Sequence, residues 1–150
     1  MLRMEPVAYV ANGESERKDE DWGNVESVIE LLDRYDGALL GLGGSSHAII
    51  ITYLHQAKFS AAAHLQRRPR NLESMPMLGI FAQRGKSRPN PLGVTAVEIV
   101  SVGDSDLVVR GLDAIDGTPV LDIKPYFPHF DRIDRPSVPD WVDRLMEGYF

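Results

Sequence analysis

A run of basic residues inside a proline-containing loop is the stretch of the sequence best suited to binding chemistry. Residues 79–93 read Gly-Ile-Phe-Ala-Gln-Arg-Gly-Lys-Ser-Arg-Pro-Asn-Pro-Leu-Gly, in which Arg84, Lys86 and Arg88 are spaced two apart. The prolines on either side of Asn90 restrict the backbone, so little conformational entropy is lost when a ligand binds. We predict a rigid cationic loop between two strands, and the alternative is an ordinary turn with solvated arginines.

A second basic cluster lies earlier in the chain. Arg67, Arg68 and Arg70 fall within residues 58–77, which show little periodicity and are interpreted as an exposed loop or flexible arm. Arginines on such an arm supply sequence-independent affinity for the phosphates of a nucleic-acid backbone. The alternative reading is that they are simply solvated.

Acidic side chains gather in residues 111–126. Asp113, Asp116 and Asp122 lie within ten residues of one another. Such carboxylates can act as acid or base groups or accept hydrogen bonds from a ligand, although aspartates in turns more often cap their own backbone.

The sequence gives no indication of a metal site. It contains no cysteine, and its histidines at 47, 55, 64 and 129 lack the spacing of metal ligands. We therefore predict no bound metal. The missing cysteines also fit a cytoplasmic protein, and neither a signal peptide nor a membrane-spanning run is found.

Charge is divided unevenly along the chain. The net charge is −6, yet residues 41–97 carry 7 basic and 1 acidic residue, while residues 1–40 carry 4 and 10 and residues 98–150 carry 5 and 11. If the middle segment folds together, it presents a positive surface that attracts an anionic partner. Alternatively, acidic residues of the flanking segments neutralise it in the folded protein.

A mostly β chain must position these groups. We predict one domain, 1–150, with an acidic loop at 12–24 and a C-terminal helix at 137–147. Residues 25–32 fit either a helical face or a strand, and we interpret them as a strand. The other predicted strands are 7–11, 46–56, 94–102, 107–112 and 120–123, chosen for their β-branched residues and the turn residues between them.

Three blocks of the sequence resemble one known family. Residues 46–56 (Ser-His…Leu-His-Gln), 81–93 (Phe-Ala-Gln-Arg-Gly-Lys-Ser-Arg-Pro-Asn-Pro-Leu-Gly) and 111–126 (Gly-Leu-Asp-Ala-Ile-Asp-Gly-Thr-Pro-Val-Leu-Asp-Ile-Lys-Pro-Tyr) are similar to the TrmO family, also called YaeB or TsaA-like. The resemblance implies a small antiparallel β-barrel with short helical elements, not a Rossmann methyltransferase. It also implies a homodimer that uses S-adenosyl-L-methionine to methylate the N6 nitrogen of N6-threonylcarbamoyladenosine, the modified base next to the anticodon in tRNA.

The same resemblance implies the cofactor contacts, while the chemistry of the reaction and the charge pattern give hypotheses for the other roles. Cofactor contacts fall on His55, Gln56, Arg84, Val94, Leu112, Asp113, Ala114 and Ile115. Either Asp116 or Asp113 is the hypothetical base, with Lys124 and Tyr126 orienting it. Substrate contacts are expected from Arg67, Arg68, Arg70, Lys86, Arg88 and Asn90.

The chain departs from the family in two places. A Pro-Arg-Gln loop usual after the first strand is replaced by a sequence beginning Asn12-Gly-Glu, and the family's Thr-Arg-Ser is Gln83-Arg84-Gly85 here. Two alternative functions therefore stay open. One is methylation of another RNA or a small molecule by S-adenosyl-L-methionine, and the other is a non-catalytic dimeric binding module.

Overall fold

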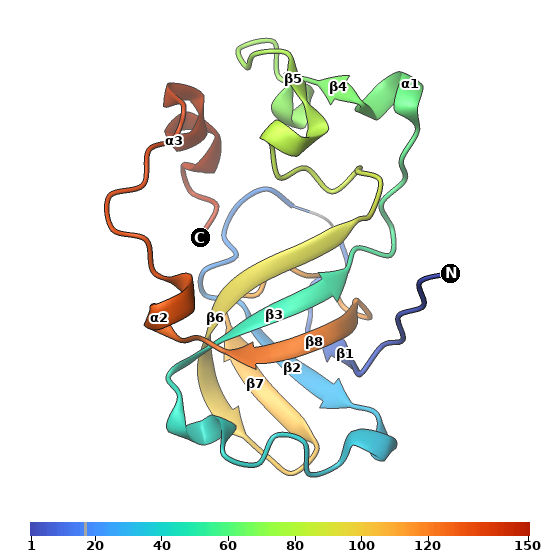
Figure 1. The fold of residues 1–150 in the computed structure, drawn as a ribbon, viewed down its shortest axis with the longest axis vertical. Helices are drawn as coiled ribbons and strands as arrows, with labels where there is room; N and C mark the ends of the chain where they lie inside the picture. The colour runs from blue at the N-terminus through green and yellow to red at the C-terminus, as the bar shows by residue number, and fades with distance from the viewer. Residues whose placement is uncertain (17) are drawn as a thin grey trace.

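The chain folds around a small β-barrel. The computed structural model describes residues 1–16 and 18–150; Arg17, within the predicted acidic loop, lies outside the described residues. Among the described residues, six antiparallel strands close in the order β1-β2-β7-β6-β3-β8 (Figure 1). Their bounds are β1 Ala8–Ala11, β2 Glu26–Leu31, β3 His47–Tyr53, β6 Leu92–Val102, β7 Asp106–Arg110 and β8 Pro119–Pro125. The mostly β fold with an antiparallel barrel is confirmed, and residues 25–32 form a strand, as predicted.

Alternating side chains fill the interior of the barrel. Along β3, Ala48, Ile50 and Thr52 are buried, whereas His47 and Tyr53 are exposed, because successive residues of a strand point to opposite faces. Inward-facing residues of the other strands, together with Leu39, Leu112 and Ala114 from the connecting segments, complete an apolar core: Ala8, Val10, Ile29, Val97, Leu107, Val109 and Val120.

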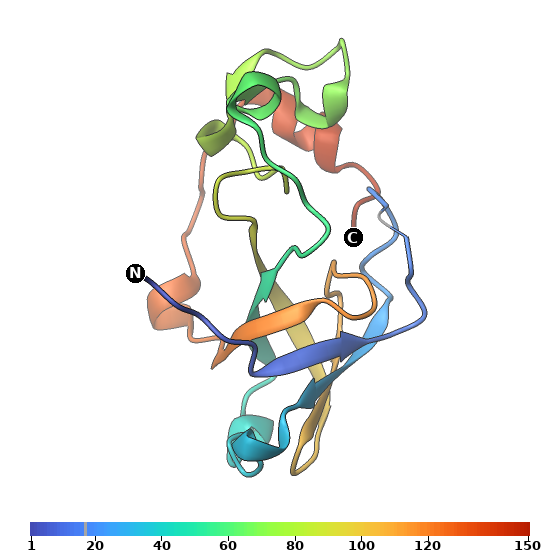
Figure 2. The same ribbon diagram turned by 90° about the vertical axis from the view of Figure 1, so that its right-hand side faces the viewer.

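Different connecting segments cover the two ends of the barrel (Figures 1 and 2). One end carries the β2–β3 connection, with the short 3-10 helices η1 Asp33–Tyr35 and η2 Leu42–Gly44. The other end carries residues 58–82, called the basic lobe below, which contain α1 Ala61–His64, β4 Gln66–Arg67, η3 Pro69–Asn71, β5 Leu78–Gly79 and η4 Ile80–Ala82.

The basic lobe has more regular structure than the sequence indicated. Its strands β4 and β5 pair with each other, and the side-chain amide of Gln83 donates to the carbonyls of Arg67 (3.0 Å) and Leu78 (3.3 Å). Ser60 caps α1 by accepting a hydrogen bond from the backbone N–H of Ala63 (3.3 Å). The β4–β5 pairing and the bond from Gln83 to Arg67 link separate segments, so local periodicity did not reveal them.

The chain ends with two helices and a short tail. These helices are α2 Pro128–Asp131 and α3 Asp140–Met146, the latter inside the predicted range 137–147. In both views the C-terminal end lies beside the loop that follows β1. No helix in the described part of the chain is both long and apolar enough to cross a bilayer.

Strand β6 is paired unevenly along its length. It pairs with β3 from Leu92 to Glu98, but with β7 only from Glu98 to Val102. Its first half therefore has β3 as its strand neighbour on one side, while loops approach the other side.

Candidate cofactor and substrate site

The first half of β6 receives two residues that the sequence placed in one site. The guanidinium Nη2 of Arg84 donates to the carbonyl oxygen of Val94 (2.8 Å). The hydroxyl of the next residue, Thr95, donates to Oδ1 of Asp113 (2.5 Å). The cationic loop and the aspartate-rich segment, far apart in sequence, thus meet at two successive residues of one strand.

The turn after β3 lies beside the same part of β6. The backbone N–H of Leu54 donates to the carbonyl of Pro91 (2.8 Å), and that of Ala57 donates to Leu54 (2.9 Å). Between them His55 and Gln56 form an exposed turn, so strand β3 ends before the predicted residue 56. The structure therefore groups this turn with the Arg84 and Asp113 contacts.

The segment 112–115 has a fixed backbone. Gly111 begins it with φ +92°, a conformation that favours glycine, and its N–H donates to the carbonyl of Val25 (3.0 Å). Leu112, Ala114 and Ile115 are buried. Thr118 donates its hydroxyl to the carbonyl of Ile115 (2.7 Å). Such a segment presents backbone groups to a ligand without having to be ordered first.

Asn12 takes part in this arrangement, although sequence reasoning gave it no role. Its side-chain Nδ2 donates to the carbonyl of Ala114 (2.9 Å) and to the hydroxyl of Ser27 (2.9 Å), while its backbone N–H donates to Oδ1 of Asp116 (2.9 Å). The N–H of Asp116 donates in turn to the carbonyl of Glu14 (2.7 Å). The residues standing where the family has Pro-Arg-Gln therefore tie the loop after β1 to the segment 112–116.

Tyr149 is a second residue that sequence reasoning missed. Its hydroxyl donates a hydrogen bond to Oδ2 of Asp113. Both oxygens of this carboxylate therefore accept a hydrogen bond from a hydroxyl group, one from Tyr149 and one from Thr95. Burial, followed by the negative charge of Asp113, raises the pKa of Tyr149 well above its ordinary value. The phenol therefore stays a proton donor at physiological pH. No local signal pointed to this contact across 36 residues of sequence.

Arg88 holds the cationic loop together from within. Its Nη1 donates to the carbonyls of Gln83 (3.0 Å) and Gly85 (3.2 Å). The carbonyl of Asn90 accepts from the N–H of Leu92 (2.7 Å), while Lys86 is exposed on the same loop. Arg88 thus links one side of the loop to the other, in addition to the restriction by the prolines.

The arginines of the basic lobe have different environments. Arg68 donates to the carbonyl of Met75. Arg70 lies 3.7 Å from Asp19 of the acidic loop and 5.8 Å from the ring centre of Tyr149. At Arg70, a flanking acidic residue does pair with a cation of the basic middle segment, which was one of the two alternatives drawn from the sequence.

The sequence was compared with models of known protein families. The model described as "tRNA-methyltransferase O N-terminal domain" matches residues 10–132. The match covers most of the chain and includes β6, the cationic loop and the segment 112–116.

The chain belongs to the TrmO family.

Individual relatives agree with that assignment. A Methanothermobacter thermautotrophicus protein named as a probable S-adenosyl-L-methionine-binding protein is 35% identical over 136 residues, covering 88% of this chain and 95% of the relative. The Escherichia coli tRNA (adenine(37)-N6)-methyltransferase is 40% identical over 100 residues, which are 64% of this chain and 42% of that enzyme. A crystal structure of TrmO from Pseudomonas aeruginosa superposes with a TM-score of 0.71 at 30% identity, covering 91% of this chain and 61% of the solved one. The chain thus spans less than two thirds of these two bacterial TrmO-family proteins.

Lys124 and Tyr126, two of the residues predicted to be catalytic, lie far from Asp116. Asp116 precedes β8, while Lys124 and Tyr126 lie at its other end. A seven-residue strand is about 20 Å long, so the structure does not have the predicted arrangement in which Lys124 and Tyr126 orient Asp116. Lys124 instead donates to Asp122 (2.7 Å), which raises the pKa of Lys124, and Tyr126 stacks edge-on against His47 at 6.5 Å. Nearness in sequence had been taken for nearness in space.

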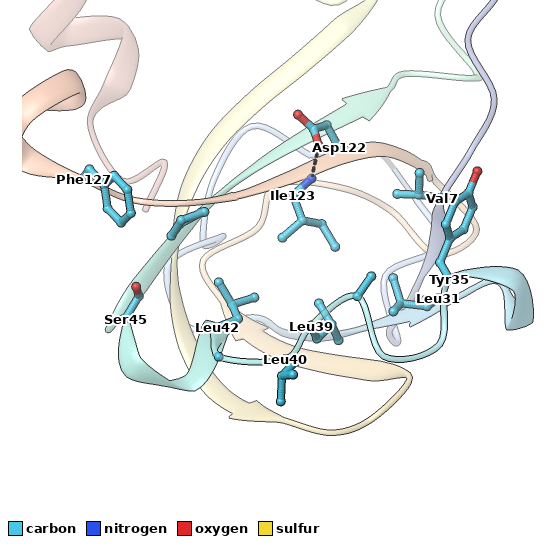
Figure 3. A pocket seen from close by; sticks show the side chains of 13 residues that line it. Val7, Leu31, Tyr35, Leu39, Leu40, Leu42, Ser45, Asp122, Ile123 and Phe127 are labelled. Carbon is cyan, nitrogen blue, oxygen red and sulfur yellow. Dashed lines mark hydrogen bonds between the residues drawn. The ribbon is translucent and has the colours of Figure 1, made fainter.

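The hollow shown in Figure 3 is separate from the site residues expected from the sequence. It measures about 460 Å³ and is lined mainly by apolar side chains of the β2–β3 connection and β8, among them Leu39, Leu42 and Ile123. It lies at the end of the barrel away from the basic lobe, and none of the predicted site residues lines it. Within the described residues, no group of three or more histidines, aspartates or glutamates is placed to hold a metal ion.

Proposed function

We propose that this chain methylates the N6 nitrogen of N6-threonylcarbamoyladenosine in tRNA, next to the anticodon. As a member of the TrmO family it is an S-adenosyl-L-methionine-dependent methyltransferase. The observation that carries the proposal is the convergence of Arg84 and Asp113 on Val94 and Thr95, beside the turn at His55–Gln56. This places a cation, hydroxyls and fixed backbone groups around one short stretch of β6.

These groups fit the chemistry of the cofactor. Arg84 supplies a positive charge for the carboxylate of the methionine moiety, and charge-assisted hydrogen bonds of this kind are strong. The fixed backbone of residues 112–115 supplies donors and acceptors for adenine. When bound, S-adenosyl-L-methionine supplies an electrophilic methyl group. The residues of the chain then act mainly by alignment, because an in-line displacement gains most from the correct placement of the reacting atoms.

The accepting nitrogen is a weak nucleophile and must lose its proton during the reaction. Both oxygens of Asp113 already accept hydrogen bonds from hydroxyl groups, those of Thr95 and Tyr149. Asp116 is exposed, and its Oδ1 has one backbone donor from Asn12. We therefore assign the role of base to Asp116, and Asp113 a structural role in the cofactor site.

The basic lobe and the cationic loop provide the surface proposed for tRNA. The proposed phosphate contacts are Arg67, Arg68 and Arg70 on the lobe and Lys86 and Arg88 on the loop. Asn90 lies between the two prolines of that loop. Lysines and arginines in such positions contact phosphates and fix the register of the nucleic acid without reading its sequence. The chain is further proposed to act as a homodimer in the cytoplasm.

Mass spectrometry of tRNA nucleosides tests the proposal. The chain is incubated with S-adenosyl-L-methionine and with tRNA that carries or lacks the threonylcarbamoyl group. One added methyl on threonylcarbamoyladenosine, with the unmodified tRNA unchanged, is the expected result. Methylation of tRNA lacking the group would indicate another RNA substrate, and failure of calorimetry to detect cofactor binding would favour a non-catalytic module.

A further inference from the structure

The tail at the end of the chain is built into the wall of the cofactor site. The backbone N–H of Asp21 donates to the carbonyl of Gly148 (2.9 Å), and that of Trp22 donates to the carbonyl of Tyr149 (2.8 Å). These two bonds join the tail to the loop after β1 through successive backbone groups. Trp22 itself is 2% exposed, so the loop side of this junction is anchored in the protein interior.

Close packing at Gly23 fixes the tail further. A Cβ added at residue 23 would lie 2.5 Å from the backbone carbonyl carbon of Phe150. A side chain at this position therefore does not fit unless the tail moves. The rings of Tyr149 and Phe150 also pack edge to face at 4.8 Å. The backbone around Tyr149 is thus held by residues 21–23 of the loop after β1.

The ring of Tyr149 stands between the basic lobe and Asp113. On one side the guanidinium of Arg70 lies 5.8 Å from the ring centre, which is within cation–π range. On the other side the phenol hydroxyl donates to Asp113. Arg70 is held at the same time by Asp19 at 3.7 Å.

The backbone of the lobe is unusual at this point. Arg70 has φ +53° and Asn71 has φ +56°. Left-handed conformations are uncommon for residues other than glycine, and they persist where surrounding contacts hold them. The contacts of Arg70 with Asp19 and Tyr149 are of that kind, so the position of the guanidinium is defined and not left to solvent.

We propose that Tyr149 is a positioning residue of the cofactor site, which holds the Asp113 carboxylate through its hydroxyl and is itself held by Arg70. This inference rests on the proposed function, because it takes Asp113 and the segment 112–115 as part of the cofactor site. The Asp113 carboxylate accepts one hydroxyl hydrogen bond on each oxygen, from Thr95 on β6 and from Tyr149 on the tail. Arg70, a proposed RNA contact, is thereby linked through Tyr149 to Asp113 of the proposed cofactor site.

Calorimetric titration with S-adenosyl-L-methionine tests this role. The variant Tyr149→Phe keeps the ring and loses the hydroxyl, and we expect its dissociation constant to rise about ten- to hundredfold, the usual effect of losing a hydrogen bond to a charged group. The matched control is Tyr9→Phe, on the outward face of β1, which should bind like the wild type. Thermal melting of each variant verifies that it is folded.

A double-mutant cycle separates positioning from a merely structural effect. Arg70→Met should weaken cofactor binding in the wild-type background and have little further effect in the Tyr149→Phe background, because both changes act through the same hydroxyl. Additive effects would overturn the link from Arg70. Unchanged binding by Tyr149→Phe, with the wild type binding normally, would overturn this inference alone, whereas a wild type that does not bind would overturn the proposed function as well.

Discussion

Arg84 and Asp113 form hydrogen bonds to adjacent residues of β6, Arg84 to the carbonyl of Val94 and Asp113 to the hydroxyl of Thr95. Successive residues of a strand point to opposite faces, and Val94 is 47% exposed while Thr95 is partly buried. The cation therefore approaches β6 at a residue that faces solvent, and the carboxylate approaches at one that faces the barrel. Two segments of opposite charge are held together on one strand by backbone and hydroxyl groups.

Replacing the proposed base tests the assignment of the chemistry. We expect Asp116→Asn to lower the rate of methyl transfer at least about a hundredfold, the lower range of general-base contributions. Because an asparagine oxygen can still accept from the N–H of Asn12, cofactor affinity and folding should be unchanged. Single-turnover methylation and calorimetry measure the two quantities. Asp122→Asn, in the middle of β8, is the matched control, and an unimpaired Asp116→Asn would remove the assignment.

The hydroxyl of Thr95 should contribute to stability through Asp113. Thr95→Val keeps the shape of the side chain and leaves the carboxylate without one of its donors. We expect the free energy of unfolding in urea to fall by about 1–3 kcal/mol. Thr95→Ser, which keeps the hydroxyl, should lose much less. A larger loss in Thr95→Ser than in Thr95→Val would indicate that the methyl group, and not the hydrogen bond, is what matters.

The packing of the tail on Gly23 predicts a difference between two glycines. Gly23→Ala pushes a methyl group against the backbone of Phe150, and overpacking of this kind costs about 1–3 kcal/mol of unfolding free energy. Gly13→Ala, in the same loop, meets no atom within 4 Å and should be nearly neutral. Urea unfolding of the two variants side by side gives the comparison. If both proved neutral, the tail would not be held in the way described.

The buried phenol of Tyr149 predicts a loss of stability in alkali. Burial and the charge of Asp113 raise the pKa of Tyr149 in the folded protein, whereas a tyrosine in the unfolded chain ionises at about pH 10. The contribution of Tyr149 to the free energy of unfolding is therefore fully present below about pH 10. It declines as the pH rises further, because only the unfolded chain then loses the phenol proton. The stability advantage of the wild type over Tyr149→Phe should shrink between about pH 9.5 and 11.5. A constant difference over that interval would contradict the predicted environment.

The strands could be predicted from the sequence because their signal is local. The Ala48–Thr52 run and residues 94–102 alternate or concentrate β-branched side chains, and both became barrel strands. The grouping of His55, Gln56 and Arg84 came from the family resemblance, and the structure brings these residues to one end of β6.

The parts that sequence reasoning missed depend on contacts across the chain. Tyr149 meets Asp113 and Asn12 meets Ala114 through single hydrogen bonds between distant segments, which leave no periodic pattern. The opposite error occurred at Lys124 and Tyr126. They follow Asp116 closely in sequence, but the extended strand β8 carries them to the other end of the barrel wall.

Hydrogen–deuterium exchange with and without S-adenosyl-L-methionine tests most directly whether the first half of β6 is the centre of the cofactor site. The structure offers two competing places, the region around Val94 and Thr95 and the apolar hollow around Leu39 and Ile123. We predict that the cofactor slows exchange in residues 54–56, 91–95 and 111–116 and leaves 35–45 and 122–127 unchanged. Protection confined to 35–45 and 122–127 would contradict the account.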